Sequence, residues 1–126
     1  MKKYNVAIMG ATGVVGGCFL KILFERKFPI KNLKLLASEN SRGKRLKFNG
    51  KSYPVEVLDH NSFKGIDIVL SSAGASRSLE FLPSAVKAGA VCVDNTSAYR
   101  MAKDVPLVVP EVNAHRIKDH LSLIHI

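Results

Sequence analysis

The sequence contains no tryptophan, only two cysteines and no long apolar run. Cys18 and Cys92 are far apart and each lies among apolar residues, which excludes a disulfide framework and a cysteine-based zinc site. We therefore expect both thiols to be buried as small hydrophobic side chains. A transmembrane helix needs roughly 20 consecutive apolar residues, and no stretch approaches that length. The apolar residues after Lys2 and Lys3 are broken by glycines without a signal-peptide cleavage site, so we expect a cytoplasmic protein.

Acidic residues are scarce: there are 10, against 19 lysines and arginines, and the formal net charge is +9. Such an excess favours anionic partners, namely nucleic acid, acidic lipid or a phosphorylated small molecule. The basic residues are spread along the chain, are densest between residues 42 and 51, and have few aromatic residues between them, which is a weak signal for nucleic acid. We therefore expect a phosphorylated ligand, and neither a nucleic-acid nor a membrane partner. Lysines solvated on helix faces account for part of the excess.

A chain of 126 residues, 47% of them hydrophobic, is long enough for one folded domain with one modest core. Residue periodicity predicts buried strands at 4–9, 33–37, 66–70, 90–93 and 107–109, helices at 14–26 and 76–88, and a further helix that begins near residue 113. A small hairpin is predicted from 45–48 and 52–58 around Asn49-Gly50. The second helix contains Pro83, which would bend or interrupt it, and it ends at Gly89. This alternation predicts an α/β fold with a Rossmann-like, doubly wound, mostly parallel sheet.

The strongest local feature is the glycine loop, residues 10–16 (Gly-Ala-Thr-Gly-Val-Val-Gly), which lies between the first predicted strand and the first predicted helix. Gly10 lets the chain turn tightly, Gly13 lets the backbone approach a pyrophosphate, and Gly16 permits close packing of helix on strand. Backbone N–H groups at the helix start then face the phosphates, where the helix dipole favours negative charge. The loop therefore predicts dinucleotide binding, and a purely structural tight turn is the alternative.

The second predicted strand ends at Ser38, where NAD-binding proteins place an acid that grips the ribose hydroxyls. Here the segment 38–45 offers hydroxyl groups, an amide and three cations. These groups suit the 2′-phosphate of NADP better than a lone carboxylate would, so NADP is the expected cofactor. Glu39 is discordant, because a carboxylate turned inward would repel that phosphate. A solvated loop without ligand contacts is the alternative.

Two more segments, 71–76 and 94–101, also follow predicted strand ends. In the first, small residues such as Ala73 and Gly74 would let a ribose of the cofactor lie against the backbone, although a plain strand–helix turn has the same composition. In the second, Arg100 offers a planar, permanently charged group to a carboxylate or a phosphate. An arginine on an exposed polar loop is the alternative for Arg100.

The glycine loop, the segments 36–44 and 94–101, and the stretch 105–113 (Val-Pro-Leu-Val-Val-Pro-Glu-Val-Asn) together resemble aspartate-semialdehyde dehydrogenase, and the resemblance extends to about His120. It implies an enzyme, a homodimer or homotetramer, that uses NADPH to reduce L-aspartyl 4-phosphate to the semialdehyde with release of phosphate. This reaction lies on the route to lysine, threonine and methionine. N-acyl-glutamyl-phosphate reductase and a non-catalytic nucleotide-sensing module are the alternatives, and a basic nucleic-acid-binding protein is a more distant one.

The resemblance also assigns residues. Thr12 to Val15 match the cofactor loop of the family, Ser38 and Ser41 match contacts of the adenosine phosphate, and Arg100 matches an arginine that binds the phosphate of the substrate, with Asn95 near it. Asn40 stands where many members have arginine, which leaves Asn40, Arg42 and Lys44 as candidates for contact with the 2′-phosphate. The full expected cofactor set is Gly10, Thr12, Gly13, Val14, Val15, Gly16, Ser38, Asn40, Ser41, Ala73 and Gly74.

The family further implies a cysteine nucleophile that forms a thioester, a later histidine acid/base and a substrate arginine in a second domain, and no residue here matches those positions. We therefore assign no catalytic and no metal-binding residue, and expect a truncated Rossmann-like domain that is inactive alone. The four histidines are expected at the surface: His60, His115, His120 and His125. The domain is expected to span residues 1–120, because residues 121–126 resemble the translated end of a sequencing-library adapter. A genuine β-strand start is the alternative for these six residues.

Overall fold

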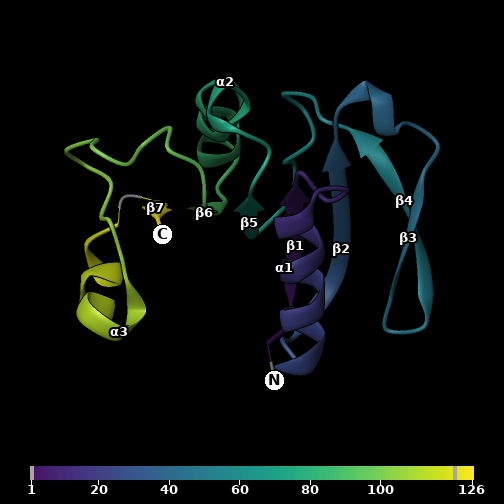
Figure 1. The fold of residues 1–126 in the computed structure, drawn as a ribbon, viewed down its shortest axis with the longest axis horizontal. Coiled ribbons are helices and arrows are strands. Elements are labelled where there is room, and N and C mark those ends of the chain that lie inside the picture. The colour runs from purple at the N-terminus through teal and green to yellow at the C-terminus, as the bar shows by residue number, and fades with distance from the viewer. Residues whose placement is uncertain (1, 121) are drawn as a thin grey trace.

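The computed structural model describes residues 2–120 and 122–126 (Figure 1). Its elements in chain order are β1 (Tyr4–Met9), α1 (Val14–Glu25), β2 (Ile30–Ala37), the 3₁₀ helix η1 (Glu39–Ser41), β3 (Arg45–Phe48), β4 (Lys51–Val57), β5 (Ile68–Ser71), α2 (Ala75–Lys87), β6 (Val91–Asp94), α3 (Pro110–Asn113), the 3₁₀ helix η2 (Ala114–Asp119) and β7 (Leu123–His125). The seven described strands form one sheet of order β3-β4-β2-β1-β5-β6-β7. Only the β3–β4 pair is antiparallel. The expected Rossmann-like, mostly parallel sheet is therefore confirmed.

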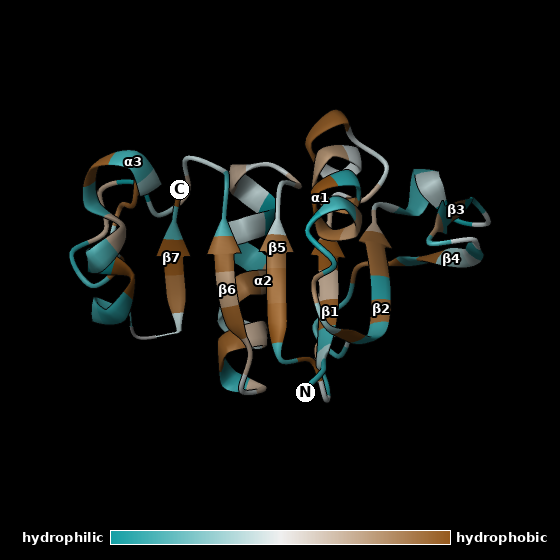
Figure 2. Ribbon diagram, turned by 90° about the horizontal axis from the view of Figure 1, so that it is seen from below, coloured by the Kyte–Doolittle hydropathy of each residue, from teal (hydrophilic) through white to brown (hydrophobic). Residues whose placement is uncertain are grey.

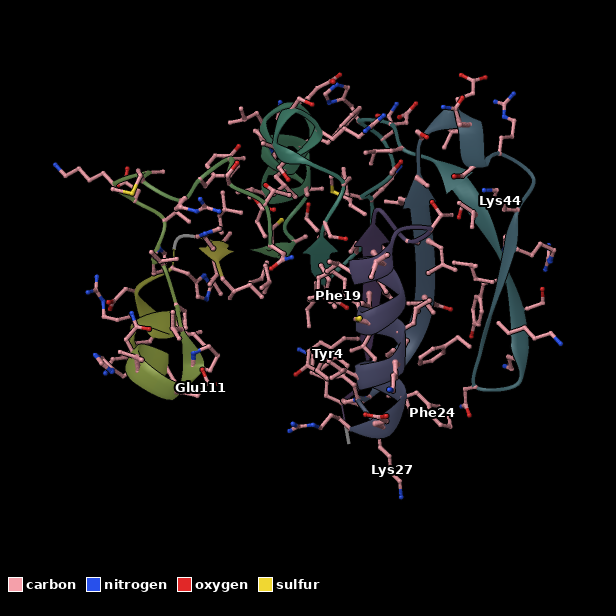
Figure 3. All side chains as sticks on the ribbon, viewed as in Figure 1. Tyr4, Phe19, Phe24, Lys27, Lys44 and Glu111 are labelled. Atoms are coloured by element: carbon pink, nitrogen blue, oxygen red, sulfur yellow. The ribbon has the colours of Figure 1, made fainter. Side chains whose placement is uncertain are left out.

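Helices α1 and α2 cover opposite faces of the sheet, whose central strands are apolar on both sides (Figures 1 and 2). On β1, Val6 and Ile8 share a buried cluster with partly buried side chains of α1, namely Phe19, Leu20 and Leu23. The alternate residues Ala7 and Met9 share the opposite cluster with Leu82 and Ala85 of α2. At its far end α1 packs Phe24 edge-on against Phe48 of the hairpin, with ring centroids 6.3 Å apart (Figure 3). None of the described helices is long and apolar enough to cross a membrane.

The local signals in the sequence predicted the hairpin and the end of α2. Asn49 and Gly50 both have positive φ, +50° and +79°, which matches the type I′ turn that joins antiparallel strands. Helix α2 runs through Pro83 without interruption. Gly89, with φ +99°, follows the helix, and the amide of Ala90 donates to the carbonyl of Ala85 at 3.0 Å, which is the hydrogen bond of a glycine-capped helix end.

The strand predicted at 107–109 is wrong: Leu107 makes one isolated bridge to His125. A longer ladder does not form because the positions on either side of Val108 whose backbone would also face β7 are Pro106 and Pro110, and proline has no N–H to donate. On the side away from β7, the Oδ1 of Asn113 accepts from the amide of Val109 at 2.7 Å, and its Nδ2 donates to the carbonyl of Leu107 at 2.9 Å. The following helix begins at Pro110, earlier than expected, because proline fits the first helical position.

The C-terminal segment joins the sheet as β7, parallel to β6, which is the alternative that the sequence left open for it. Leu123, Ile124 and His125 are all buried, and Leu121 lies outside the described residues. The expectation that His125 lies at the surface is wrong, because the register places it beside Asp94 and its Nδ1 lies 3.1 Å from the carbonyl oxygen of Asp94. A non-native origin of residues 121–126 stays a prediction.

Candidate functional site

Four polar or glycine-rich segments meet at one edge of the sheet. Residues 10–16 follow β1, 38–45 follow β2, 72–76 follow β5 and 95–101 follow β6. These four strands are neighbours and run parallel, so their carboxyl ends lie side by side. Open parallel sheets bind ligands outside the carboxyl ends of their strands, and here helices α1 and α2 leave that edge on opposite faces of the sheet (Figure 1).

The glycine loop is packed too closely to carry side chains at two of its positions. Gly10 has φ +82°, and a Cβ there would lie 2.9 Å from the carbonyl carbon and oxygen of Ser72. A Cβ on Gly16 would lie 2.2 Å from the carbonyl oxygen of Gly10. Gly13 differs, because its φ is −83° and a Cβ would meet only that same oxygen, at 3.5 Å, an ordinary contact. Two glycines are therefore required by the fold, and the third leaves open space at the start of α1.

The amino end of α1 is open to an anion. Its N-cap, Gly13, supplies no side-chain cap, and no acidic residue lies in the first turn. The first amides of an α-helix have no acceptor within the helix, and the helix dipole places positive charge there. Thr12, Val14 and Val15 around these amides are exposed, Val14 to 87%. The arrangement fits a pyrophosphate, which needs backbone donors and room for close approach.

The segment after β2 touches the glycine loop directly. The hydroxyl oxygens of Thr12 and Ser41 lie 3.1 Å apart, and Ser41 is only 6% exposed. Ser38, half-buried, precedes η1, and its carbonyl accepts from the amide of Ser41 at 3.0 Å. Asn40 lies exposed on the same short helix. The structure thus brings the two predicted cofactor segments together.

Three cations follow η1, and the structure separates them by what they contact. Arg45 is committed to the hairpin, since its Nε and Nη2 donate to the hydroxyl and the carbonyl of Ser52 at 2.8 and 3.0 Å. Arg42 Nη1 lies 3.6 Å from Glu39 Oε1 in an exposed ion pair. Lys44 is exposed at the start of the hairpin (Figure 3). The charge of Glu39, which was discordant in the sequence, has a neighbouring counter-charge here.

The turn after β5 lies against the turn after β1. The amide of Ser72 donates to the carbonyl of Met9 at 2.9 Å, which extends the β1–β5 ladder by one step. Gly74, with φ +95°, is the N-cap of α2 and has no side-chain cap either. Ala73 is half-buried and Gly74 is exposed. The predicted residues Ala73 and Gly74 therefore lie at the same edge as the glycine loop.

The segment after β6 is held by a buried carboxylate that sequence reasoning missed. Asp94 is 0% exposed, and its Oδ1 accepts from the Ser78 hydroxyl and from the Thr96 amide, both at 3.0 Å. Its Oδ2 accepts from the Thr96 hydroxyl at 2.9 Å. Asn95 and Arg100 are exposed beyond it, and the residues that the structure describes include no ion-pair partner for Arg100. An aspartate followed two residues later by threonine, at a strand end, is the sequence signal for this turn.

The two cysteines differ. Cys92 is buried in β6, and burial, with a smaller contribution from the charge of Asp94, raises the pKa of its thiol to about 12. The expectation of burial is wrong for Cys18, which is exposed on the side of α1 that faces away from the sheet. The pKa of the Tyr99 hydroxyl is also raised, first by burial and then by the charges of Asp94 and of Cys92. Within residues 2–120 and 122–126, no group of three histidine, cysteine or acidic side chains is placed to hold a metal ion.

A family model, related sequences and related structures match this chain and indicate the same family. Residues 5–120 match the model of the semialdehyde dehydrogenase NAD-binding domain. Aspartate-semialdehyde dehydrogenase of Aquifex aeolicus is 60% identical over 117 residues, which cover 92% of this chain and 34% of that protein. The crystal structure of aspartate semialdehyde dehydrogenase II from Vibrio cholerae superimposes with a TM-score of 0.94 at 45% identity, covering 98% of this chain and 38% of that one.

Aspartate semialdehyde dehydrogenase with NADP from Candida albicans superimposes with a TM-score of 0.77 at 27% identity, over 99% of this chain and 42% of that one. The chain therefore spans about a third of the length of the curated relatives that it matches. The matched residues include the glycine loop, the segments after β2, β5 and β6, and α3. The chain belongs to the semialdehyde dehydrogenase family and corresponds to the NAD-binding domain of that family.

Proposed function

We propose that this chain is the NADP-binding part of an aspartate-semialdehyde dehydrogenase, which reduces L-aspartyl 4-phosphate to L-aspartate 4-semialdehyde with NADPH and releases phosphate. The observation that carries the proposal is the open amino end of α1. Close packing at Gly10 and Gly16 positions this end, and the contact between Thr12 and Ser41 places the segment after β2 beside it. The family match and the relatives named above support the choice of reaction.

Each segment has a distinct role in this proposal. Backbone amides of Thr12, Val14 and Val15 bind the pyrophosphate, and Gly13, whose amide donates to the carbonyl of Gly10 at 3.1 Å, gives it room to approach. Gly10 and Gly16 allow the loop to pack against its neighbours. The polar group after β2 binds the adenosine ribose and its 2′-phosphate through Ser38, Asn40 and Ser41. Ala73 and Gly74 leave room for the nicotinamide ribose. When bound, NADPH supplies a hydride.

The substrate is a small acyl phosphate, and the exposed Arg100 binds its phosphate with the help of Asn95. A thiolate must attack the acyl carbon to form the thioester that is reduced. Cys92 does not fit that role, because it is buried and its pKa of about 12 keeps it protonated at neutral pH. We assign the nucleophile and the acid/base to parts of a parent enzyme, a homodimer or homotetramer in the cytoplasm, outside these 126 residues.

Substitution of Gly13 tests the cofactor site without disturbing the fold. In Gly13→Ala the methyl group meets only the Gly10 carbonyl, at 3.5 Å, and the φ of −83° suits alanine, so the thermal melting temperature should stay near that of the unmodified chain. The same methyl group blocks the close approach of a pyrophosphate. Titration calorimetry should show that NADPH affinity falls at least about tenfold, a free-energy change of about 1.4 kcal/mol.

Gly17→Ala is the matched control, because Gly17 lies one turn further along α1 and its Cβ would have no neighbour within 4 Å. This variant should bind NADPH as the unmodified chain does. If the folded, unmodified chain binds no NADPH, or if both alanine variants bind equally well, the cofactor site is not where we place it.

Arg100 is tested with inorganic phosphate as the probe. In ¹H–¹⁵N correlation spectra, phosphate should shift amide signals of residues 94–101, and Arg100→Gln should abolish the shifts. The control is Arg26→Gln, an exposed arginine at the opposite end of α1, which should leave them unchanged. Equal effects of the two substitutions would indicate general attraction of anions to a chain of net charge +9 and would remove the case for Arg100.

A further inference from the structure

The pair formed by Glu39 and Arg42 lies where a dinucleotide-binding fold contacts the adenosine ribose. Both residues flank the turn that follows β2, and the side chains are 74% and 71% exposed. The contact between the hydroxyls of Ser41 and Thr12 places this turn against the glycine loop. The carboxyl end of the second strand is the position at which such folds distinguish a ribose 2′-hydroxyl from a 2′-phosphate.

The pair is held weakly. Its Nη1–Oε1 distance is 3.6 Å, beyond a good charge-assisted hydrogen bond, and exposed ion pairs of this kind contribute little and are screened by salt. Arg42 is the arginine of this segment that remains available, because the guanidinium of Arg45 is bound to Ser52. Lys44 is a flexible point charge without the planar fork that matches a phosphate.

We propose, on the basis of the proposed function, that Glu39 is the resident counter-ion of Arg42 and that the pair sets the preference between NADP and NAD. A 2′-phosphate carries about two negative charges and accepts two parallel hydrogen bonds from a guanidinium, so it displaces the single carboxylate. Arg42 then contacts the phosphate. Glu39 is left beside that phosphate and repels it, which lowers the affinity for NADPH. NADH carries no 2′-phosphate and leaves the pair intact.

Four proteins test this exchange: the unmodified chain, Glu39→Gln, Arg42→Gln and the double variant. Each is titrated by calorimetry with NADPH, NADH, adenosine 2′,5′-bisphosphate and AMP, at about 50 and 200 mM salt. Arg42→Gln should weaken NADPH and the bisphosphate about tenfold or more and leave NADH and AMP unchanged. Glu39→Gln should strengthen NADPH about two- to fivefold, more at the lower salt, with NADH again unchanged. In the double variant the gain from Glu39→Gln should shrink, since Arg42 is the group that Glu39 neutralises.

Glu25→Gln is the matched control. Glu25 forms another exposed ion pair, with Lys21 at 4.0 Å, near the end of α1 remote from the site. Its removal changes the net charge by the same amount as Glu39→Gln and should leave every affinity unchanged. Two results would overturn the proposal that the 2′-phosphate replaces Glu39 as the partner of Arg42, while NADPH binding itself would stand. One is an equal effect of Glu25→Gln and Glu39→Gln, and the other is a ratio of NADPH affinity to NADH affinity that Arg42→Gln does not alter. Absence of binding by the folded, unmodified chain would overturn the proposed function as well.

Discussion

Two adjacent glycines in α1 should respond in opposite directions to the same substitution. A Cβ on Gly16 would lie 2.2 Å from the Gly10 carbonyl oxygen and 2.8 and 2.9 Å from the Cα and carbonyl carbon of Ala11, all backbone atoms. These atoms cannot retreat, because the amides of Gly10 and Ala11 both donate to the carbonyl of Leu36, at 2.9 and 3.2 Å. In Gly16→Ala, α1 must therefore move away from the sheet. A Cβ on Gly17 would meet no atom within 4 Å.

The magnitudes follow from two opposing effects. Alanine in place of glycine within a helix stabilises it by about 1 kcal/mol, since the unfolded chain loses conformational freedom. An added methyl group in a packed region costs about 1–3 kcal/mol, and contact with backbone puts Gly16 at the upper end. Gly16→Ala should therefore lower the free energy of unfolding by about 2 kcal/mol, whereas Gly17→Ala should raise it by about 0.5–1 kcal/mol.

Urea denaturation followed by far-ultraviolet circular dichroism measures both changes. The denaturation midpoints should move in opposite directions while the dependence of the free energy on urea stays unchanged, so that the shifts report stability alone. Two midpoints displaced in the same direction would refute the reasoning, because the substitutions differ only in what the added carbon meets. A Gly16→Ala variant as stable as the unmodified chain would show that α1 does not press on the glycine loop.

Three side chains, those of Ser78, Cys18 and Cys92, give further tests. Ser78→Ala removes a hydrogen bond from the buried Asp94 carboxylate and should cost about 1–3 kcal/mol of unfolding free energy, whereas the exposed Ser76→Ala on the same helix should change it by less than about 0.5 kcal/mol. At about pH 8 a thiol reagent should modify Cys18 in the folded chain and reach Cys92 only in denaturant. Because folding raises the pKa of Cys92 from 9.0 to about 12, the stability from its neutral thiol is complete below pH 9 and is lost as the pH rises through 12. A Cys92→Ala variant should show a shallower loss over that range, and an equally steep one would contradict this assignment.

Much of the fold was predictable because its signals are local. Tyr4–Met9 and Arg45–Phe48 have the predicted bounds, since a glycine or an Asn-Gly turn ends each strand where the backbone needs positive φ. The conformation of residues 107–109 was not predictable in this way. They have strand composition, but Pro106 and Pro110 leave Val108 as the donor toward β7, and which backbone groups face that strand becomes visible only in three dimensions.

Burial was harder to predict on elements that are apolar on all sides. Helix α1 carries hydrophobic residues around most of its circumference, so its sequence does not reveal which face packs, and Cys18 lies on the exposed one. The opposite error occurred at His125, a polar residue that the parallel register of β7 buries. In both cases the neighbouring strand decides the environment of the side chain, and the residue type does not.

The sequence predicted which segments form the candidate site, but it did not predict the contacts between them. Once the strands are parallel, the segments after β1, β2, β5 and β6 must share one edge, so their proximity follows from topology. The contacts within that edge join residues far apart in sequence. Thr12 and Ser41 are 29 residues apart, and Ser78 and Asp94 are 16 apart. Side-chain contacts of this kind leave no periodic pattern in the sequence.

The buried Asp94 holds the segment after β6 in place, which no helix directly follows. The turns after β1 and β5 lead directly into α1 and α2, which pack on the sheet and hold those turns in place. After β6 no helix begins before Pro110, so residues 95–109 have no such support. The carboxylate of Asp94 supplies it, because its three hydrogen bonds tie Thr96 to Ser78 of α2, and the amide of Asn95 donates to the carbonyl of Ser71 at 2.9 Å. The segment that carries Arg100 is thereby fixed to the same helix and strand that position the turn at Gly74, so a phosphate held by Arg100 would keep a constant relation to the cofactor edge.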